Sequence, residues 1–385
     1  MELRNKRIYI VSQEKWGKMF LSKHHYAVEL GKEGNQVFFF NHPDSKRVLK
    51  RGEIIITKTQ FLNVFVINHR YLLPLYFIKF KLKSKLVYNL LLRLHLKKIS
   101  KLTGAPDMLW SFDLTDYIPL KCFPNQCLKI FLPVDESVWQ DSINAAASAK
   151  VIISVTNEIL AKYDRYNVPK AFINHGVSEI FINEDCSEKA DKIIRVGYSG
   201  SILRPDIDRT TLLTIIKQNT NCLFEFWGEC DYNDSYLEIR INKEEGTEQF
   251  VSTLKSLNNV TLHGVVTSEK LAAGLKQMDA FLICYNIKIE QSHGTNSHKI
   301  LEYLGTGKTV VANNISTYYK TFPGLIEMIE SRENNNELPA LFSKVINNLN
   351  EHNSIIKMKS RIDFAKGFTY KNQVKRLADF LSVNE

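Results

Sequence analysis

The chain has 385 residues, of which 44% are hydrophobic and 24% charged, and its formal net charge is +10. These fractions are typical of a globular protein, so they exclude disordered and fibrous classes, and the length suits two domains better than one. The six cysteines form no C-x-x-C pair and have no zinc-site spacing, which is typical of thiols in a reducing compartment.

The positive charge is concentrated in one segment. No acidic residue occurs from Ile54 to Pro106, whereas this stretch contains eight lysines and two arginines. A charge held in one place indicates a local anionic partner. Within it, the stretch 71–101 mixes lysine with leucine, tyrosine and phenylalanine, a composition that suits contact with an anionic membrane surface. A buried helix with a solvated basic face is the alternative.

The sequence has no signal-peptide core after Met1–Arg7 and no uncharged apolar run of the roughly 18 residues needed to span a bilayer. We therefore expect a cytoplasmic protein. Peripheral attachment to the inner face of the cell membrane through 71–101 is compatible with this expectation.

Short apolar runs alternate with helical patterns in the first half of the chain. A helix is expected at Phe20–Leu30, where apolar residues recur at helical spacing before Gly31. The apolar runs predict strands at Ile8–Ser12, Gln36–Phe40, Asn63–Asn68, Asp107–Ser111, Leu128–Leu132 and Val151–Val155. This alternation is typical of parallel βα units with helices on both faces of a sheet.

The alternation stops in Ile173–Ala190 and then resumes. The second half predicts strands at Lys192–Tyr198, Leu223–Trp227, Val260–His263, Ala280–Tyr285 and Thr309–Ala312, with helices at Ser268–Met278 and Ser297–Leu304. We therefore predict an α/β protein with two Rossmann-like domains, 1–178 and 179–360. Ligands bind beyond the carboxyl ends of such strands, so we expect the two domains to face each other across a cleft.

Four segments stand out as motifs: INHGV (173–177), VGYSGS (196–201), the stretch 258–285 and SHKILEYLGTGKTVVA (297–312). Together they resemble the nucleotide-sugar domain of the large retaining family of bacterial cell-surface polysaccharide glycosyltransferases, the glycosyl transferases of group 1. In the first half, Trp16–Phe39 is similar to a subgroup pattern whose histidine falls on His25. The resemblance implies the GT-B architecture, with an acceptor domain at 1–178 and a nucleotide-sugar domain at 179–360. The end of the chain, 361–385, looks like the family's closing helix, which crosses back onto the first domain.

Glu302, in the last of these motifs, is the first candidate for a functional residue. The resemblance implies that it accepts hydrogen bonds from the ribose hydroxyls of the nucleotide, and a carboxylate offers paired acceptors for a diol. Asn296, Ser297 and Lys299 lie at or before the N-terminus of the same helix, where free N–H groups and a lysine charge favour a diphosphate. A solvated glutamate and a capping serine are the plain alternatives.

Gly200, Ser201 and Arg204 belong to the turn after the first strand of this domain. Glycine lets backbone amides approach an anion closely, and the resemblance implies a basic residue here that neutralises the leaving diphosphate. A tight turn and a solvated arginine are the alternatives. Asp206 and Asp208 have D-x-D spacing, but they lie near a helix start, where aspartate is common, so we predict no metal.

His25 and Asp135 are the catalytic candidates of the first domain. A histidine beside a cleft can orient a sugar hydroxyl or transfer a proton, although a structural histidine on a half-buried helix is an equal alternative. Asp135 follows a predicted strand at its carboxyl end. Two positions depart from the family: Ser22 stands where the subgroup has arginine, and Gly294 where the family often has the first of two glutamates, which usually faces the sugar.

Other classes fit the sequence less well. GTGKT at 305–309 lacks the first glycine of a phosphate-binding loop and follows a helix rather than a strand. The turn at Gly197–Gly200 lacks the G-x-G-x-x-G of dinucleotide-dependent oxidoreductases. No nucleic-acid-binding module is recognisable, so no nucleic acid partner is expected. A sugar-nucleotide epimerase and a catalytically silent GT-B-like partner subunit remain open, the latter because of Gly294.

The sequence thus predicts a glycosyltransferase that moves a sugar from a nucleoside-diphosphate sugar to a hydroxyl of a glycan or lipid-linked acceptor. The resemblance implies hexosyl transfer with retention of configuration, in cell-surface polysaccharide or glycolipid synthesis. Lys299, Arg204 and helix-end amides would meet the charge of the leaving diphosphate, so neither a metal nor a cofactor besides the donor is predicted.

Overall fold

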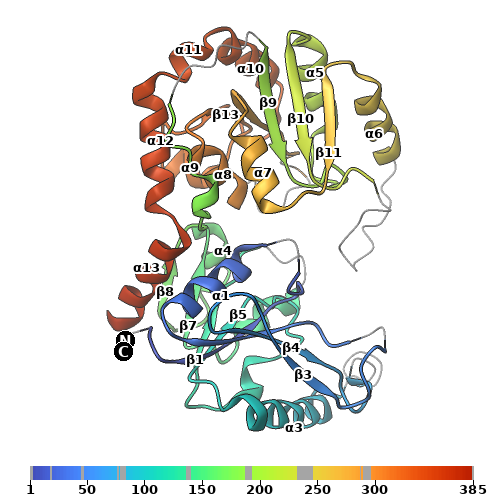
Figure 1. The fold of residues 1–385 in the computed structure, drawn as a ribbon, viewed down its shortest axis with the longest axis vertical. Helices are drawn as coiled ribbons and strands as arrows, with labels where there is room; N and C mark the ends of the chain where they lie inside the picture. Colours follow the sequence, from blue (N-terminus) through green and yellow to red (C-terminus); the bar gives the residue numbers. More distant parts are fainter. Residues whose placement is uncertain are drawn as a thin grey trace. The chain divides into compact units, whose positions relative to one another are not determined.

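The computed structural model describes residues 3–17, 20–44, 47–75, 78, 84–135, 140–186, 193–231, 246–286, 288 and 296–383. The chain divides into two compact units. Unit 1 comprises Met1–Asn174 and Tyr370–Glu385, and unit 2 comprises His175–Thr369. Each unit is built around a β-sheet with helices on both faces (Figure 1).

In the described part of unit 1, eight strands form one sheet in the order β3-β4-β2-β1-β5-β6-β7-β8. The strands are β1 (Arg7–Val11), β2 (Gln36–Phe40), β3 (Ile54–Lys58), β4 (Val64–His69), β5 (Met108–Ser111), β6 (Leu128–Phe131), β7 (Val151–Ser154) and β8 (Lys170–Phe172). Neighbouring strands are parallel except β3 and β4, which are antiparallel. Strand β3 was missed from the sequence, although its run IIITK is rich in β-branched residues; it is an edge strand with no buried residue.

Strand β1 shows how the sheet of unit 1 is covered. Tyr9 belongs to the cluster on the face covered by α3 (Lys85–Thr103). Ile10 belongs to the cluster on the opposite face, which contains residues of α1 (Ser22–Lys32) and α13 (Tyr370–Val383). Successive side chains of a strand point to opposite faces, so a strand covered on both sides is apolar throughout. The other helical segments of this unit are η1 (Leu120–Cys122), η2 (Gln140–Ala146) and α4 (Asn157–Ala161).

In the described part of unit 2, six parallel strands form a sheet in the order β11-β10-β9-β12-β13-β14. The strands are β9 (Ile194–Ser199), β10 (Cys222–Trp227), β11 (Val260–Gly264), β12 (Ala280–Ile283), β13 (Thr309–Ala312) and β14 (Glu327–Met328). The chain goes from β9 outward to β10 and β11 and then returns to β12 on the other side. The order therefore reverses between β9 and β12, and sheets of this kind bind ligands at such a point.

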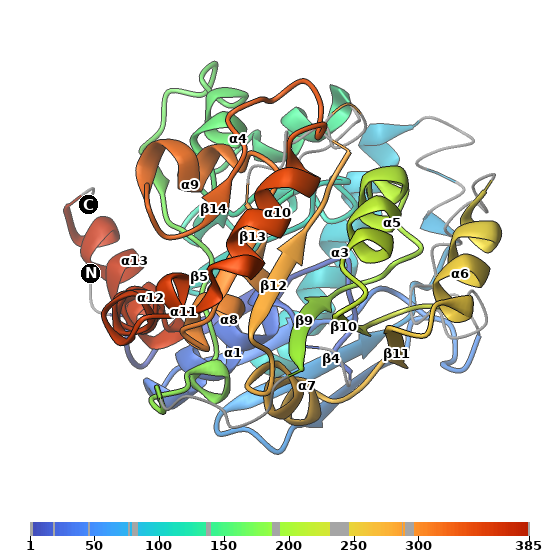
Figure 2. The same cartoon turned by 90° about the horizontal axis from the view of Figure 1, so that it is seen from above.

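Helices cover both faces of this second sheet (Figure 2). One face packs against α5 (Arg209–Gln218), α6 (Thr247–Ser256) and α10 (Leu338–Asn347). The other packs against α7 (Ser268–Leu275) and α8 (His298–Gly305). The remaining helical segments are η3 (Glu179–Phe181), α9 (Ser316–Thr321), α11 (Leu349–His352) and α12 (Ile355–Gly367). The predicted α/β class with two Rossmann-like domains is confirmed.

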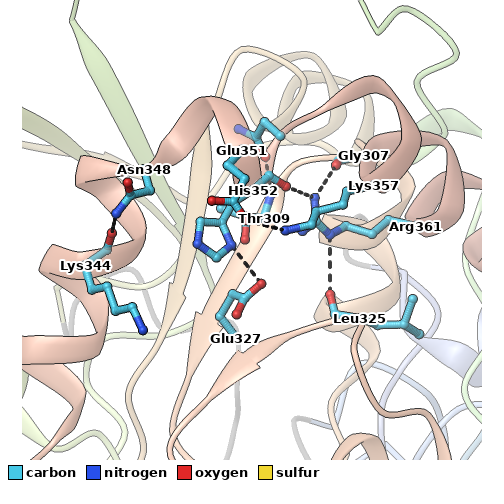
Figure 3. A network of polar contacts seen from close by, with 11 residues as sticks. Gly307, Thr309, Leu325, Glu327, Lys344, Asn348, Glu351, His352, Lys357 and Arg361 are labelled. Carbon is cyan, nitrogen blue, oxygen red and sulfur yellow. Dashed lines mark hydrogen bonds and ion pairs between the residues drawn. The ribbon is translucent and has the colours of Figure 1, made fainter.

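Arg361 fixes α12 to the rest of unit 2 (Figure 3). Its side chain is buried, and its Nη1 donates hydrogen bonds to the carbonyl oxygens of Gly307 (3.1 Å) and His352 (2.9 Å). Its Nε donates to the carbonyl oxygen of Leu325 at 3.4 Å. Gly307 lies in the GTGKT segment, which is the turn from α8 into β13 and has a φ of 80° at that glycine. This turn runs from helix to strand, the reverse of a phosphate-binding loop.

The boundaries between the two units differ from those expected from the sequence. The first passage from unit 1 to unit 2 lies at 174/175, and the return lies at 369/370. The expected boundary at 360/361 falls inside α12, because this helix continues without a break to Gly367 and belongs to unit 2. The helix that packs on unit 1 is α13, which contacts α1. No helix of the described residues is long and apolar enough to cross a bilayer.

Candidate functional site

The turn after β9 makes an unusually close backbone contact with the turn after β10. Gly200 has a φ of 133° and Gly228 a φ of 128°. A Cβ atom on Gly228 would lie 2.3 Å from the carbonyl oxygen of Gly200, so only glycine fits there. Gly200 N–H donates to the Trp227 carbonyl at 2.7 Å, and Gly228 N–H donates to the Gly264 carbonyl at 2.8 Å. Backbone hydrogen bonds therefore hold the carboxyl ends of β9, β10 and β11 together.

The Lys299 ammonium lies against this turn. A Cβ atom on Gly200 would lie only 2.6 Å from Lys299 Nζ. Lys299 Nζ is 4.4 Å from the ring centre of Tyr198 and 5.5 Å from that of Tyr285, and it donates a hydrogen bond of 3.3 Å to the Tyr198 hydroxyl. Lys299 is 6% exposed, and no carboxylate among the described residues lies within ion-pair distance of it. A cation buried among aromatic rings with no carboxylate within ion-pair distance is costly, so this position favours an anionic ligand.

Tyr303 fixes the helix that carries Lys299. Its hydroxyl accepts a hydrogen bond from Ser199 N–H at 2.7 Å and lies 3.0 Å from the Ser199 hydroxyl. Its ring stacks on Phe281 of β12, with ring centres 4.1 Å apart. Helix α8 is thereby attached to β9 and β12, the two strands at which the strand order reverses.

Glu302 lies on α8, one turn after His298. Its side chain is 15% exposed, and its Oε1 is 4.0 Å from His298 Nε2. Burial raises the pKa of the Glu302 carboxyl to about 7, although the charge of Lys299 acts in the opposite direction. No hydrogen bond from the described residues reaches this carboxylate. Its oxygens therefore remain available as acceptors.

Ser297 and Asn296 precede α8 and are half-buried. The expectation that Ser297 is the N-cap residue is confirmed by its position, with φ −129° and ψ 136°. Its side chain, however, makes no capping hydrogen bond. The Ser297 carbonyl accepts from Ile300 N–H at 3.1 Å, so the first turn of α8 is met by the backbone of Ser297 and not by its hydroxyl.

Arg204 is not a simple solvated arginine. Its Nε donates to Asp206 Oδ1 at 2.8 Å and its Nη2 to Asp206 Oδ2, so the two groups form a bidentate pair. The guanidinium also lies 5.8 Å from the ring centre of Tyr285, the ring that Lys299 contacts from its own side. Arg204 is half exposed, and the negative charge of Asp206 offsets its positive charge.

The other residues of the turn have local roles. The Ser201 hydroxyl accepts a hydrogen bond from Leu203 N–H at 3.3 Å. Asp208 caps α5, because its Oδ1 accepts from Thr211 N–H at 3.1 Å. The D-x-D spacing is therefore divided between an ion pair and a helix cap, as expected for aspartates at a helix start. Among the described residues, no group of three or more His, Cys, Asp or Glu is arranged to hold a metal ion.

The two catalytic candidates of unit 1 lie on different elements. His25, on α1, is half-buried and stacks on Tyr370 of α13 with ring centres 4.6 Å apart. Phe20 contacts the same imidazole edge-on at 5.4 Å. Asp135 is exposed in the loop after β6. The stacking accounts for His25 as a structural residue and leaves its proposed catalytic role as a prediction.

Sequence reasoning missed the residues next to His25. Lys23 is 4% exposed and forms an ion pair with Glu14, whose carboxylate also accepts a hydrogen bond from the Ser12 hydroxyl at 2.8 Å. His24 is fully buried, and burial lowers its pKa to about 4. This network fixes the loop after β1. The sequence analysis also did not identify Tyr198 and Tyr285, although both stand at the ends of predicted strands, where ligands bind.

No protein-family model matches the chain, and no curated protein matches it in sequence. Solved structures do match it over nearly its whole length. Sucrose-phosphate synthase from Thermosynechococcus elongatus has a TM-score of 0.68 at 10% identity, covering 98% of both chains. The Anabaena protein HepE, solved with UDP and glucose, has a TM-score of 0.67 at 13% identity, covering 98% of this chain and 99% of its own. The lipopolysaccharide outer core galactosyltransferase WaaB has a TM-score of 0.61 at 12% identity, covering 98% of this chain and 100% of its own. The chain therefore has the GT-B fold of these glycosyltransferases.

Proposed function

We propose that this protein is a glycosyltransferase that binds a nucleoside-diphosphate sugar in unit 2 and transfers the sugar to an acceptor hydroxyl. One observation carries the proposal: the buried Lys299 ammonium has no carboxylate partner among the described residues and lies at the carboxyl ends of β9 and β12. A diphosphate would supply the missing negative charge.

The surrounding residues fit the other parts of such a donor. Gly200 brings the backbone of its turn against Lys299, so no side chain separates the turn from a phosphate there. The Ser297 side chain does not cap the first turn of α8, so this positive end of the helix dipole would favour a phosphate. Glu302 lies one turn further along α8 and offers two carboxylate oxygens to a ribose diol. The diphosphate and the ribose diol would thus be met by one helix and the turn beside it.

The structural neighbours support a sugar nucleotide as the donor. HepE was solved with UDP and also with UDP-glucose, and WaaB is named as a galactosyltransferase. We propose hexosyl transfer with retention of configuration and without a metal ion. Lys299, the α8 amides and Arg204 would then meet the charge of the leaving diphosphate. Because Arg204 is already paired with Asp206, we expect its contribution to be smaller than that of Lys299.

We further propose that unit 1 binds the acceptor, a glycan or a lipid-linked sugar, in cell-surface polysaccharide or glycolipid synthesis. His25 and Asp135 are the candidates for orienting or deprotonating the acceptor hydroxyl. We place the reaction in the cytoplasm at the inner face of the cell membrane, since the segment 71–101 combines lysines with apolar residues.

Calorimetric titration with UDP, GDP, dTDP and ADP tests the donor site. One nucleotide should bind the intact protein, and both Lys299→Met and Glu302→Ala should weaken it about tenfold or more, because each removes a charged partner. Lys217→Met and Glu333→Ala, which change exposed residues on the same unit, serve as matched controls and should bind normally. Normal binding by Lys299→Met would remove the main support for the proposal.

A catalytically silent GT-B-like partner is the second candidate, because Gly294 replaces a glutamate that the resemblance leads one to expect. Gly294 lies outside the described residues, so the two candidates must be separated by turnover. Release of UDP from UDP-glucose, in the presence of a membrane extract that contains acceptors, indicates an enzyme. Tight nucleotide binding without turnover of any sugar nucleotide indicates the silent partner.

A further inference from the structure

Helix α3 exposes a row of leucines on its outer face. Leu86 is 86% exposed, Leu90 is 60% exposed and Leu94 is 58% exposed. Residues four apart lie on one side of an α-helix, so the three side chains form a line that extends about 12 Å along the helix. Val87, at 46% exposure, lies beside this line. Single exposed leucines are common, whereas a row of them marks a contact surface.

The row is additional to the packing of α3 on its own sheet. Tyr88, Leu92, Leu96 and Ile99 form the opposite face and are buried in the core of unit 1. The helix is further tied to β4 by a 2.9 Å hydrogen bond between the imidazoles of His69 and His95. The outer leucines therefore take no part in the packing of α3 on the sheet. The inner residues and the hydrogen bond to β4 fix the helix in position.

Positive charges accompany the leucines on the same helix. Arg93 and Lys98 each donate to a backbone carbonyl, of Lys121 and Gly52 respectively. Lys97 and Lys101 follow Leu94 by three and seven residues, so they lie on the same side of the helix; both are exposed and form no ion pair with described residues. No acidic residue occurs in 54–106 to neutralise them. The outer face therefore combines apolar side chains with uncompensated positive charge.

We propose that the outer face of α3 lies on an anionic lipid bilayer, with Leu86, Leu90 and Leu94 at the boundary of headgroups and acyl chains. Lys97 and Lys101 would then contact lipid phosphates, as in helices that lie in the membrane interface. The outer face of α3 would be the surface through which the protein contacts the membrane, as placed under the proposed function. This contact does not depend on the nucleotide site of unit 2.

Charge decides between a bilayer and a second copy of the chain. In a symmetric dimer the same face would meet itself, and the lysines of the two copies would be brought together. Like charges at an interface are unfavourable, whereas an anionic surface matches them. Nucleic acid would match the lysines but would leave the leucines in water.

Vesicle flotation with the full chain tests the proposal. The probes are vesicles of phosphatidylglycerol with phosphatidylcholine, and vesicles of phosphatidylcholine alone. We expect binding to the anionic vesicles and a loss of about tenfold or more in L86Q/L90Q, since each leucine gains free energy on leaving water. The matched control is I355Q/I356Q, which changes two residues that are 58% and 82% exposed on α12 of unit 2, and it should bind like the unchanged protein.

The charges are tested separately. K97Q/K101Q should bind anionic vesicles several-fold more weakly and should lose most of its sensitivity to salt, whereas K217Q/K255Q, on exposed positions of unit 2, should not. Equal vesicle binding by L86Q/L90Q and I355Q/I356Q would overturn the proposal. So would a dimer in light scattering that L86Q/L90Q converts to a monomer while vesicle binding is absent. All variants should keep their nucleotide affinity, which separates a failure here from a failure of the donor site.

Discussion

The Lys299 ammonium is buried against the ring of Tyr198, 4.4 Å from the ring centre, and donates a hydrogen bond to the hydroxyl of the same tyrosine. The ring and the hydroxyl hold the cation without neutralising it. An aromatic partner of this kind holds the lysine side chain in place and supplies no negative charge that would compete with a ligand.

Tyr198→Phe should separate positioning from charge. The ring remains, so the contact between ring and ammonium survives, but the hydrogen bond is lost. We expect nucleotide affinity to fall by about two- to tenfold in calorimetry, less than in Lys299→Met. A loss as large as that of Lys299→Met would mean that the hydroxyl itself contacts the ligand.

Glu302 should make stability depend on pH. Its pKa of about 7 is above the ordinary glutamate value, so the folded protein holds a proton there that the unfolded chain has lost between about pH 4.5 and 7. The contribution of this group to stability is therefore present at low pH and falls as pH rises to about 7, by at most about 3 kcal/mol. Glu302→Gln should flatten this part of the pH profile in urea unfolding. Glu333→Gln, at an exposed position, should leave it unchanged.

The same carboxyl should couple nucleotide binding to proton release. Ribose hydroxyls that donate to Glu302 favour its ionised form and lower its pKa. At pH 6.5 we expect binding to release a fraction of a proton, measured by calorimetry in buffers of different ionisation enthalpy. Glu302→Gln should abolish this release. Release that is unchanged in the variant would assign the proton to another group.

Tyr303→Phe should destabilise unit 2 by leaving the buried Ser199 N–H without its acceptor. The expected cost is about 1–3 kcal/mol in chemical unfolding. Tyr319→Phe removes a hydroxyl from a tyrosine that is 45% exposed and should cost close to nothing. Equal effects of the two variants would contradict the role given to Tyr303.

Gly228→Ala should be more harmful than a positive φ alone explains. The added Cβ would lie 2.3 Å from the Gly200 carbonyl oxygen. Gly324 also has a positive φ, 84°, but a Cβ there would meet nothing within 4 Å. Gly324→Ala should cost about 1–2 kcal/mol, and Gly228→Ala clearly more, because it must also force two strand ends apart. Thermal unfolding of the two variants measures the difference.

The strands with continuous buried runs were predictable from sequence. QVFFF of β2 and CLFEFW of β10 are mostly apolar, with Glu225 as the buried exception in β10, because helices cover both faces of their sheets. Strand β3 has the same signal in IIITK and was missed nonetheless, and the structure shows it as an edge strand with no buried residue. Similarly, the break between α12 and α13 was missed, since both segments have helical character and only their packing partners differ.

The site was predictable only in part. Motif order pointed to Lys299 and Glu302, but the pairing of Arg204 with Asp206 depends on side-chain direction in a turn, which spacing does not give. Likewise, the sequence places His24 and His25 side by side on a helix. Only the structure shows that one is fully buried and the other half-buried against Tyr370.

Arg361 also decides how unit 2 can be transplanted. Its guanidinium donates hydrogen bonds to carbonyl oxygens of three separate segments, at Gly307, Leu325 and His352. A fragment that ends at residue 360 would omit this arginine and cut α12 in the middle. A chimaera that joins unit 2 to a different first unit should therefore exchange residues 175–369 as one piece. Swaps at these junctions keep every contact of Arg361 within the transplanted segment.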